Sequence, residues 1–414
     1  MKICLLSYRG NMCCGGQGIY LYHVSRELAK LGHDVHVIVG PPYPFEMDWA
    51  TVHKIKTPQF SEFTGERLTA ENLSLLSAYE YTLANIGVFP EMFSFSIRAF
   101  FKVKELMRKE NFDVIHDNQC LGYGLLLIKA LGVPVIATIH HPLPIDRIMA
   151  MRLARTSKER FKQIIFYPMF MQKIVANFMD RVVTVSQTSA RSIMKHFKVP
   201  RKKISVIYNG VDADVFRPMD GGSGDGDYYR LLFVGNTDNR VKGIGLLLRA
   251  VRYMKDELGL NVKLTIVDRF KEEGIAQPFI KEYALQDDVS FTGFLTMEEL
   301  AQQYASSDLV MLSSMFEGFS LVAAEAMACG KPVVGFRVGA LSEVVENGVT
   351  GILVEPGNWK ELAHAAAMLL EDEKLRKQMG ANGRRRVECL FTWEKAAREL
   401  EKVYMEVADV NHKP

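Results

Sequence analysis

The chain alternates short apolar strands with helical stretches, and this alternation restricts its fold more than any other feature. In the first half the strand-like runs are continuous, as in "KICLLSY", "DVHVIVG", "FDVIHD", "VPVIATIH" and "RVVTVS". Continuous apolar runs indicate strands that are covered on both faces, which is typical of a parallel α/β sheet. A helix is expected after the first run, from about Ile19 to Leu31.

The pattern stops at a segment rich in Gly, Ser and Asp, residues 218–229, and then begins again with "RLLFVGN", "VKLTIVD", "DVSFTG", "DLVMLSS", "KPVVGF" and "TGILVE". We therefore predict an α/β protein with two doubly wound, Rossmann-like domains, residues 1–215 and 216–392, joined by this linker. A helix over 393–414 is expected to pack back toward the first domain. Because ligands of such sheets bind at the carboxyl ends of the strands, the site is expected in a cleft between the domains.

Composition narrows the class of protein. The chain has 414 residues, 48% of them apolar and 24% charged, with a net charge of +3. These values are typical of a soluble globular enzyme and exclude a nucleic-acid binder with a large excess of basic residues. The N-terminal apolar run is too short for a secretory signal, and the six cysteines show no Cys-x2-Cys spacing, so a cytoplasmic protein with reduced thiols is expected.

The glycine-rich stretch "MCCGGQG", residues 12–18, follows the first predicted strand. Adjacent Cys13 and Cys14 could bridge only in a strained ring, so thiol chemistry is not expected. Gly15 and Gly16 lack side chains, and the amides up to Gln17 could approach a ligand at the start of the helix. The stretch lacks G-x-G-x-x-G, and no acidic residue ends the second strand, which argues against a nicotinamide oxidoreductase.

Two carboxylates stand eight residues apart in "FEGFSLVAAEAMACGKPVV". Glu317 lies in the loop after a predicted strand, and Glu325 lies on the next helix among small apolar residues, where an isolated carboxylate would be costly. The N–H groups of Phe319, Ser320 and Leu321 at the helix start could bind an anion. A nucleotide sugar offers hydroxyls and phosphates to such a site; the alternative is a solvated loop residue and a surface helix residue.

Cations and histidines also stand at predicted strand ends. Arg240 and Lys242 oppose the dipole of the following helix, so they either neutralise a diphosphate or are simply exposed in a turn. His140 and His141 end a strand, and at most one of them can face a given ligand. One is either a hydrogen-bonded structural residue or a contact to a sugar.

Two further stretches have alternative interpretations. "DAD", residues 212–214, imitates a metal-binding Asp-x-Asp but is predicted to be a hydrogen-bonded turn. Residues 147–178 interleave cations with Met, Phe and Ile, a pattern that suits either an anionic membrane surface or an ordinary helix pair with a basic face.

The chain resembles the retaining glycosyltransferases of family 4, which have the GT-B architecture. The motifs that carry the resemblance include "GGQG", "ATIHH", "VIYNGVD", "VKG" and above all "FEGFSLVAAEAMACGKPVV" with its Glu-x7-Glu spacing. The resemblance implies that Glu317 contacts the hydroxyls of the donor sugar, Glu325 the ribose and Lys242 the diphosphate, and that His140 approaches the sugar. Further donor contacts would come from Asn236, Arg240, Gly293, Gly318, Phe319, Ser320 and Leu321, and the acceptor and phosphate loop would be Gly15, Gly16 and Gln17.

Two positions depart from the family pattern. Asn236 stands where the family usually has an Arg that helps Lys242 grip the diphosphate, and we suggest that Arg240 supplies this charge. Ser320 stands where Gly is commoner, and its side chain could narrow the sugar pocket.

The expected reaction is transfer of a hexose from a nucleoside diphosphate sugar to a hydroxyl acceptor, with retention and without a cofactor or an essential metal. A UDP-sugar is the first donor expected and GDP-mannose the second. The acceptor is either a small soluble molecule or a lipid-linked glycan, the latter with peripheral membrane contact through 147–178. The alternatives are a nucleotide-sugar epimerase or hydrolase and a non-catalytic nucleotide-binding module.

Overall fold

The structure is a computed structural model that describes residues 1–12, 15–58, 69, 74–85, 88–154, 156–157, 160, 169–219 and 227–411. It forms two compact units. The first comprises Met1–Tyr208 and Trp393–Pro414, and the second comprises Asn209–Thr392. No helix among the described residues is both long and apolar enough to cross a membrane.

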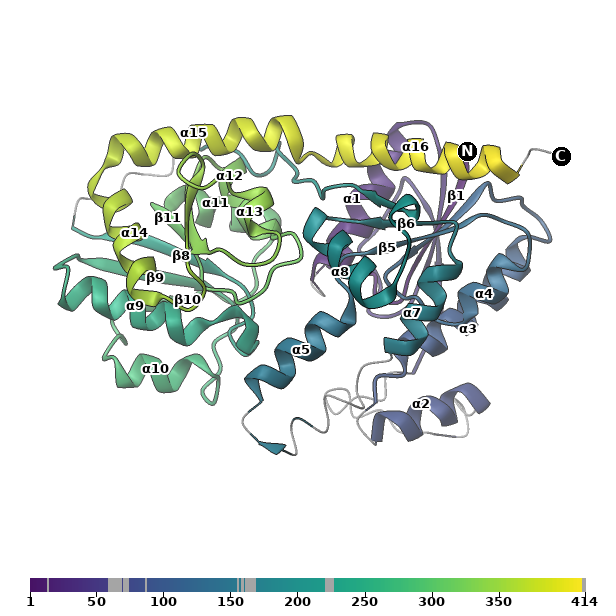
Figure 1. Cartoon of the computed structure of the whole chain (residues 1–414), viewed down its shortest axis with the longest axis horizontal. Helices are drawn as coiled ribbons and strands as arrows, with labels where there is room; N and C mark the ends of the chain where they lie inside the picture. The colour runs from purple at the N-terminus through teal and green to yellow at the C-terminus, as the bar shows by residue number, and fades with distance from the viewer. Residues whose placement is uncertain are drawn as a thin grey trace. The chain divides into compact units, whose positions relative to one another are not determined.

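The first unit contains a seven-stranded, fully parallel sheet in the order β3-β2-β1-β4-β5-β6-β7. Figure 1 labels β1, β5 and β6 of this sheet. Its strands are β1 (Lys2–Ser7), β2 (Asp34–Val39), β3 (Thr51–Lys54), β4 (Val114–Asn118), β5 (Val135–Ile139), β6 (Arg181–Thr184) and β7 (Ile204–Val206). Every residue of β4 and β5 is buried. This confirms that the continuous apolar runs are strands covered on both faces.

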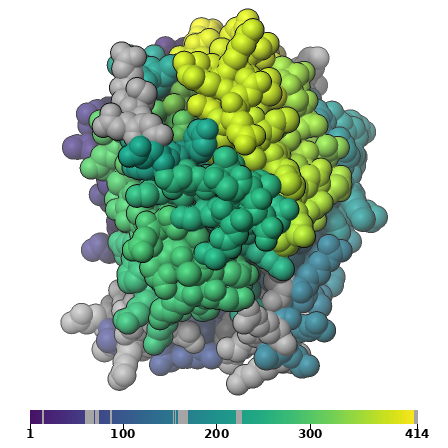
Figure 2. Space-filling view, turned by 90° about the vertical axis from the view of Figure 1, so that its left-hand side faces the viewer, coloured from purple at the N-terminus to yellow at the C-terminus, as the bar shows by residue number. Residues whose placement is uncertain are grey.

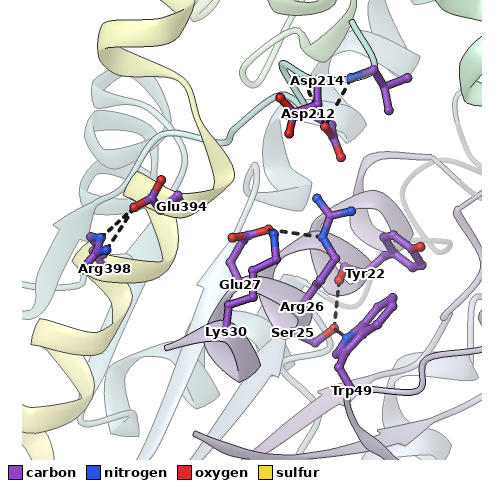
Figure 3. Close-up of polar contacts among 11 residues, drawn as sticks. Tyr22, Ser25, Arg26, Glu27, Lys30, Trp49, Asp212, Asp214, Glu394 and Arg398 are labelled. Atoms are coloured by element: carbon purple, nitrogen blue, oxygen red, sulfur yellow. Dashed lines mark hydrogen bonds and ion pairs between the residues drawn. The ribbon is translucent and has the colours of Figure 1, made fainter. Parts of the chain in front are cut away.

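The helices of the first unit are α1 (Gly16–Lys30), α2 (Leu75–Asn85), α3 (Glu91–Leu106), α4 (Gly124–Lys129), α5 (Leu143–Leu153), α7 (Met169–Phe178), α8 (Gln187–Phe197) and α16 (Trp393–Asn411), with the short turn η2 (Arg201–Lys203). Helix α16 packs on α1, where the Trp393 ring stacks on His23 with centroids 5.2 Å apart. Figure 3 shows the other side of α1, where Trp49 Nε1 donates to Ser25 Oγ at 3.1 Å.

The second unit contains a six-stranded, fully parallel sheet in the order β10-β9-β8-β11-β12-β13. Its strands are β8 (Tyr229–Val234), β9 (Val262–Val267), β10 (Val289–Phe291), β11 (Leu309–Leu312), β12 (Val333–Phe336) and β13 (Gly351–Val354). Its helices are η3 (Arg240–Lys242), α9 (Ile244–Asp256), α10 (Ala276–Glu282), α11 (Met297–Ser306), α12 (Leu321–Ala328), α13 (Leu341–Val344), α14 (Trp359–Glu371) and α15 (Glu373–Leu390). Helices α9 and α14 pack side by side, and Figure 2 shows the surface of this unit with α9 and α10 in green and the α14–α15 segment in yellow.

The boundary between the units differs from the predicted division at residue 215. The second unit begins at Asn209 because residues 209–215 are tied to its end: Val211 pairs with Thr392, and Arg384 Nη1 donates to the Ala213 carbonyl at 3.2 Å. The C-terminal helix, predicted over 393–414 to pack back toward the first domain, is α16 and belongs to the first unit. Of the predicted linker, residues 220–226 lie outside the described part of the chain.

Each sheet reverses its strand order once, between β1 and β4 in the first unit and between β8 and β11 in the second. At such a switch point the loops after the two strands diverge to opposite faces of the sheet, which leaves a crevice at the carboxyl ends. The loops after β1, β8 and β11 carry Gly15, Lys242 and Glu317, whereas His140 follows β5 and Gly293 follows β10.

Candidate active site

Lys242 and Glu317 form an ion pair at the switch point of the second unit. Lys242 ends the η3 turn after β8, and Glu317 lies in the loop between β11 and α12. Lys242 Nζ donates to Glu317 Oε1 at 2.8 Å, and the Glu317 side chain is only 9% exposed. The structure therefore brings together the cation and the carboxylate that the sequence analysis assigned to the diphosphate and the sugar.

The two loops that carry this pair are hydrogen-bonded to each other. Ser313 Oγ donates to the Lys242 carbonyl at 2.8 Å, and the Met315 N–H donates to the Val241 carbonyl at 2.7 Å. Gly243 has a φ of 66°, and a Cβ there would lie 2.1 Å from the Ser313 carbonyl oxygen. Only glycine allows this approach, so the "VKG" motif holds Lys242 in place above β11.

The Glu317 loop is also held from its other side. The Ala340 N–H donates to the Glu317 carbonyl at 2.9 Å. Gly339, with a φ of 51°, lies so close that a Cβ would be 2.1 Å from the same oxygen. The position of the Glu317 carboxylate is thus set by a rigid loop, and the alternative of a solvated loop residue is wrong.

Glu325 is buried on α12 and has a partner. Tyr304, on α11, donates its hydroxyl to Glu325 Oε2 at 2.9 Å. Burial raises the pKa of the Glu325 carboxyl to about 7, and the Tyr304 hydrogen bond lowers that pKa in part. The alternative of a surface helix residue is therefore wrong as well, because Glu325 is only 8% exposed.

Ser320 and Leu321 form the N-terminal end of α12. Ser320 is the N-cap in a left-handed conformation, with φ 81° and ψ 80°, and its side chain makes no capping hydrogen bond. The first turn of a helix offers N–H groups that the helix itself does not use. Gly318 and Phe319 precede it, and the buried Phe319 ring packs against Phe391 with centroids 5.5 Å apart. The Phe319 side chain thus anchors the loop.

The remaining residues predicted at the donor lie after β8 and β10. Asn236 Oδ1 accepts from the Asp238 N–H at 2.9 Å, so this oxygen shapes its own turn. Arg240 is the first residue of η3, two positions before Lys242. Gly293 follows β10 with a φ of 79°, and its N–H donates to the Asp268 carbonyl at 3.0 Å.

His140 follows β5, the neighbour of β4, and contacts Asn118 at the end of β4. The amide of Asn118 contacts two groups. Its Nδ2 donates to the Gln17 carbonyl at 3.0 Å, and its Oδ1 lies 2.8 Å from His140 Nε2. Because the Gln17 carbonyl can only accept, the nitrogen of the amide must face Gln17 and the oxygen must face His140. His140 Nε2 must therefore carry its proton, and Nδ1 is left as an acceptor. Burial, assisted by the charges of His141 and His116, lowers the pKa of His140 to about 3. His140 is thus neutral at physiological pH.

His141 and His140 contact different groups, as expected for adjacent residues at the end of a strand. Its Nε2 lies 2.7 Å from Asp146 Oδ2 on α5. His140 is oriented by its backbone, whose N–H donates to Gln119 Oε1 at 2.7 Å. Only His140 therefore belongs to the Asn118 network at the switch point.

The glycine-rich stretch begins helix α1 earlier than predicted. Gly15 is the N-cap with a φ of 99°, and the helix starts at Gly16 instead of Ile19. A Cβ on Gly18 would lie 2.0 Å from the Asn11 carbonyl oxygen, so these glycines let the helix start against the loop after β1. Gln17 belongs to the first helical turn. Cys13 and Cys14 lie outside the described residues.

The "DAD" segment forms the turn that was predicted. Asp212 Oδ1 accepts from the N–H groups of Asp214 at 3.3 Å and Val215 at 3.4 Å (Figure 3). The carboxylate of Asp212 therefore stabilises its own backbone.

Comparison with known proteins identifies the family. Residues 14–215 match the model of "Glycosyltransferase Family 4", and residues 222–386 match that of "Glycosyl transferases group 1". The chain is also 38% identical over 411 residues to the MMP alpha-(1->4)-mannosyltransferase of Mycolicibacterium hassiacum, covering 98% of both chains. The chain belongs to glycosyltransferase family 4.

Other relatives of this family 4 glycosyltransferase are more distant. A D-inositol 3-phosphate glycosyltransferase of Thermobispora bispora is 27% identical over 99% of this chain and 94% of its own. Among solved structures, sucrose-phosphate synthase from Thermosynechococcus elongatus matches with a TM-score of 0.75 and 24% identity, over 99% of this chain and 100% of its own. Anabaena HepE in complex with UDP-glucose matches with a TM-score of 0.70 and 20% identity, over 98% and 100%. These likenesses support the GT-B fold of two Rossmann-like domains.

Several polar residues of this glycosyltransferase site were missed by the sequence analysis. Asn118 and Gln119 orient His140, Tyr304 holds Glu325, and Asp268 Oδ2 accepts from the Thr237 N–H at 2.7 Å. A polar residue that ends a buried strand, as Asn118 does, or directly follows one, as Asp268 does, is such a signal, because it lies at the carboxyl end of the strand. Tyr304 has no comparable signal, since it comes from the middle of an amphipathic helix.

Proposed function

We propose that this glycosyltransferase moves a hexose from a nucleoside diphosphate sugar to a hydroxyl acceptor, with retention and without an essential metal. The observation that carries the proposal is the Lys242–Glu317 pair, 2.8 Å long, at the switch point of the second unit. The pair places a cation next to a carboxylate on two loops that are hydrogen-bonded to each other. The cation can bind the diphosphate of a nucleotide sugar, and the carboxylate can accept hydrogen bonds from the sugar hydroxyls.

Each side chain has a role that follows from its chemistry. Lys242 would meet the negative charge that grows on the leaving diphosphate, together with the first N–H groups of α12. Glu317 would accept hydrogen bonds from the sugar, and Glu325 from the ribose. His140 is neutral, so it would accept a hydrogen bond through Nδ1 and would not act as a general acid.

Retention would follow from attack on the face that the diphosphate leaves. The only carboxylates assigned to the donor are Glu317, held by Lys242, and Glu325, held by Tyr304. Neither is assigned as a nucleophile, so no covalent enzyme intermediate is proposed. The acceptor would lose its proton to the departing diphosphate oxygen as the new bond forms. Lys242, with Arg240, would supply the positive charge that a divalent ion supplies in metal-dependent enzymes.

For the donor, we place GDP-mannose ahead of the UDP-sugars. The support is the relative at 38% identity, which is named as an alpha-(1->4)-mannosyltransferase. The nucleoside diphosphate mannose of metabolism is α-linked, so an α-linked product would mean retention. A mannose-containing oligosaccharide is the acceptor to test first.

The test is a binding and transfer panel. GDP-mannose, UDP-glucose and UDP-N-acetylglucosamine are titrated calorimetrically, and the best donor is then assayed with and without an oligosaccharide acceptor in EDTA. We expect one donor to bind and turnover to require the acceptor. Acceptor-independent turnover would favour the hydrolase or epimerase, and binding without turnover on any acceptor would favour the non-catalytic module.

We further propose a cytoplasmic enzyme whose residues 147–178 contact an anionic membrane surface that carries a lipid-linked acceptor. Helix α7 supports this because Phe170, Ile174 and Phe178 are 78%, 42% and 58% exposed at a spacing of four residues, on one helix face. The neighbouring α8 exposes Arg191 and Lys195, and its C-cap residue Lys198 is exposed as well. Residues 181–211 contain no Asp or Glu. Residues 155, 158–159 and 161–168 of this stretch lie outside the described part of the chain.

Vesicle sedimentation tests the membrane contact. The wild-type chain is expected to sediment with vesicles that contain anionic phosphatidylglycerol. With neutral phosphatidylcholine vesicles it should stay in the supernatant. The double variant Phe170→Ser, Lys195→Glu should no longer bind the anionic vesicles. The control Phe270→Ser should still bind them, because Phe270 is an equally bulky side chain, 62% exposed, in the other unit. Equal binding by all three proteins would contradict the proposal.

A further inference from the structure

Ser320 carries two structural costs that a glycine would remove. Its backbone is left-handed, with a φ of 81°, a conformation that is unfavourable for any residue with a Cβ. Its hydroxyl is buried, and Oγ has no hydrogen-bond partner within the described structure. Each of these features lowers the stability of the ligand-free protein.

The hydroxyl does not serve the helix that Ser320 begins. In this chain the N-cap side chains of Ser186, Thr296, Asn358 and Asp372 each accept a hydrogen bond from an N–H in the first turn of their helix. The Ser320 side chain makes no such bond to α12. Its left-handed backbone accounts for the difference, because capping serines normally have an extended backbone. The hydroxyl is therefore left for a group outside the protein.

The surroundings of Ser320 indicate what that group is. Ser320 lies three residues after Glu317, whose carboxylate accepts from Lys242 at 2.8 Å and whose carbonyl accepts from Ala340 at 2.9 Å. The loop that leads to Ser320 is therefore held from both sides at Glu317. Ser320 is the N-cap of α12 and is only 6% exposed.

We infer that Ser320 is a specificity-determining residue whose hydroxyl hydrogen-bonds to a hydroxyl of the donor hexose; this inference rests on the proposed function. A buried hydroxyl without a hydrogen-bond partner among the described residues gains its hydrogen bond only when a correctly placed sugar oxygen arrives. A sugar that lacks or inverts that oxygen leaves the group unsatisfied, which is the physical basis of strong discrimination. Ser320 thus adds a contact that a glycine at this position cannot make.

The experiment measures stability and donor affinity in the same variants. Ser320→Gly removes both costs, and its melting temperature is expected to rise by about 2 to 4 °C. Its dissociation constant for the nucleoside diphosphate hexose should rise about fivefold, which corresponds to ~1 kcal/mol. Affinity for the free nucleoside diphosphate should not change. Ser320→Ala keeps the left-handed strain and lacks only the hydroxyl, so it should show the same loss of donor affinity.

Ala284→Gly is the matched control. Ala284 is exposed and has a φ of 50°, so glycine there should raise the melting temperature with no effect on donor binding. Wild-type donor affinity in Ser320→Ala would overturn the inference, and so would an equal loss for the free nucleoside diphosphate, which would place the contact at the phosphates. Failure of the wild-type protein to bind any nucleoside diphosphate hexose would instead contradict the proposed function.

Discussion

Lys242 Nζ lies 2.8 Å from Glu317 Oε1, so in the absence of donor the cation is balanced by the carboxylate assigned to the sugar. Donor binding would give each partner a new group: the diphosphate replaces Glu317 as the counter-charge of Lys242, and sugar hydroxyls replace Lys242 at Glu317. Neither group is left buried without a partner in either state. This exchange lowers the cost of keeping two charges ready in a partly buried site.

Lys242→Met should therefore affect activity and stability differently. Loss of the diphosphate contact is expected to lower turnover at least a hundredfold. Stability should fall by only about 1 to 3 kcal/mol, because the Lys242 side chain is 25% exposed and water still reaches the pair. Urea unfolding and transfer assays measure the two effects. In the double variant with Glu317→Gln, the stability should recover while activity stays low; an additive loss of stability would contradict the coupling.

Arg240→Ala tests whether Arg240 replaces the cation absent at Asn236. A charge-assisted contact to the diphosphate contributes ~1.5 to 3 kcal/mol, so donor affinity should fall at least tenfold by calorimetry. Arg249→Ala is the control, since Arg249 has the same charge but packs over the Trp359 ring at 4.3 Å. If the two variants bind donor equally well, Arg240 has no such role.

Glu325 predicts how stability depends on pH. Its folded pKa, about 7, is above the ordinary value of 4.5. A carboxyl with a raised folded pKa contributes stability that is fully present below the unfolded pKa and lost as pH rises through the folded value. The wild type should thus lose roughly 3 kcal/mol of unfolding free energy between pH 4.5 and 7.5, relative to Glu325→Gln, whose side chain does not titrate. A difference independent of pH would show that Glu325 is not buried as described.

The same carboxyl predicts how donor binding depends on pH. Ribose hydroxyls bind an ionised carboxylate more strongly than a protonated one, so donor affinity should increase as pH rises through about 7. In Glu325→Gln the affinity should be lower and independent of pH. Tyr304→Phe removes a hydrogen bond that lowers the pKa of Glu325, so the midpoint should move to higher pH. A midpoint that stays in place would contradict the assignment.

His140 should leave no titration in the activity between pH 5 and 9. Burial lowers its pKa to about 3, so it remains neutral throughout this range. His140→Ala is expected to reduce turnover while the midpoint near pH 7 stays where Glu325 sets it. Asn118→Ala, which removes the acceptor of the His140 Nε2 proton at 2.8 Å, should reduce turnover in the same way. A changed pH profile in His140→Ala would show that this histidine transfers a proton.

The sheets, and the places of the main candidate residues after their strands, could be predicted from the sequence because their signals are local. Buried parallel strands appear in the sequence as continuous apolar runs. A charged residue in the loop after such a run, such as Glu317, is expected near the carboxyl ends of the strands. The contacts that orient the site could not be predicted, because they join distant segments. Asn118 reaches His140 only because β4 pairs with β5, and Tyr304 reaches Glu325 only because α11 packs on α12. The start of α1 at Gly16 was missed because glycine usually disfavours a helix.

The most direct test of the central claim is the anomeric configuration of the first product formed from GDP-mannose and a mannose-containing oligosaccharide in the presence of EDTA. The one-bond carbon–hydrogen coupling at the anomeric carbon of the new glycosidic bond, measured by NMR, distinguishes the two anomers. The proposed mechanism predicts an α-linked product with full activity in EDTA. A β-linked product, or transfer that stops in EDTA and returns with a divalent cation, would contradict it.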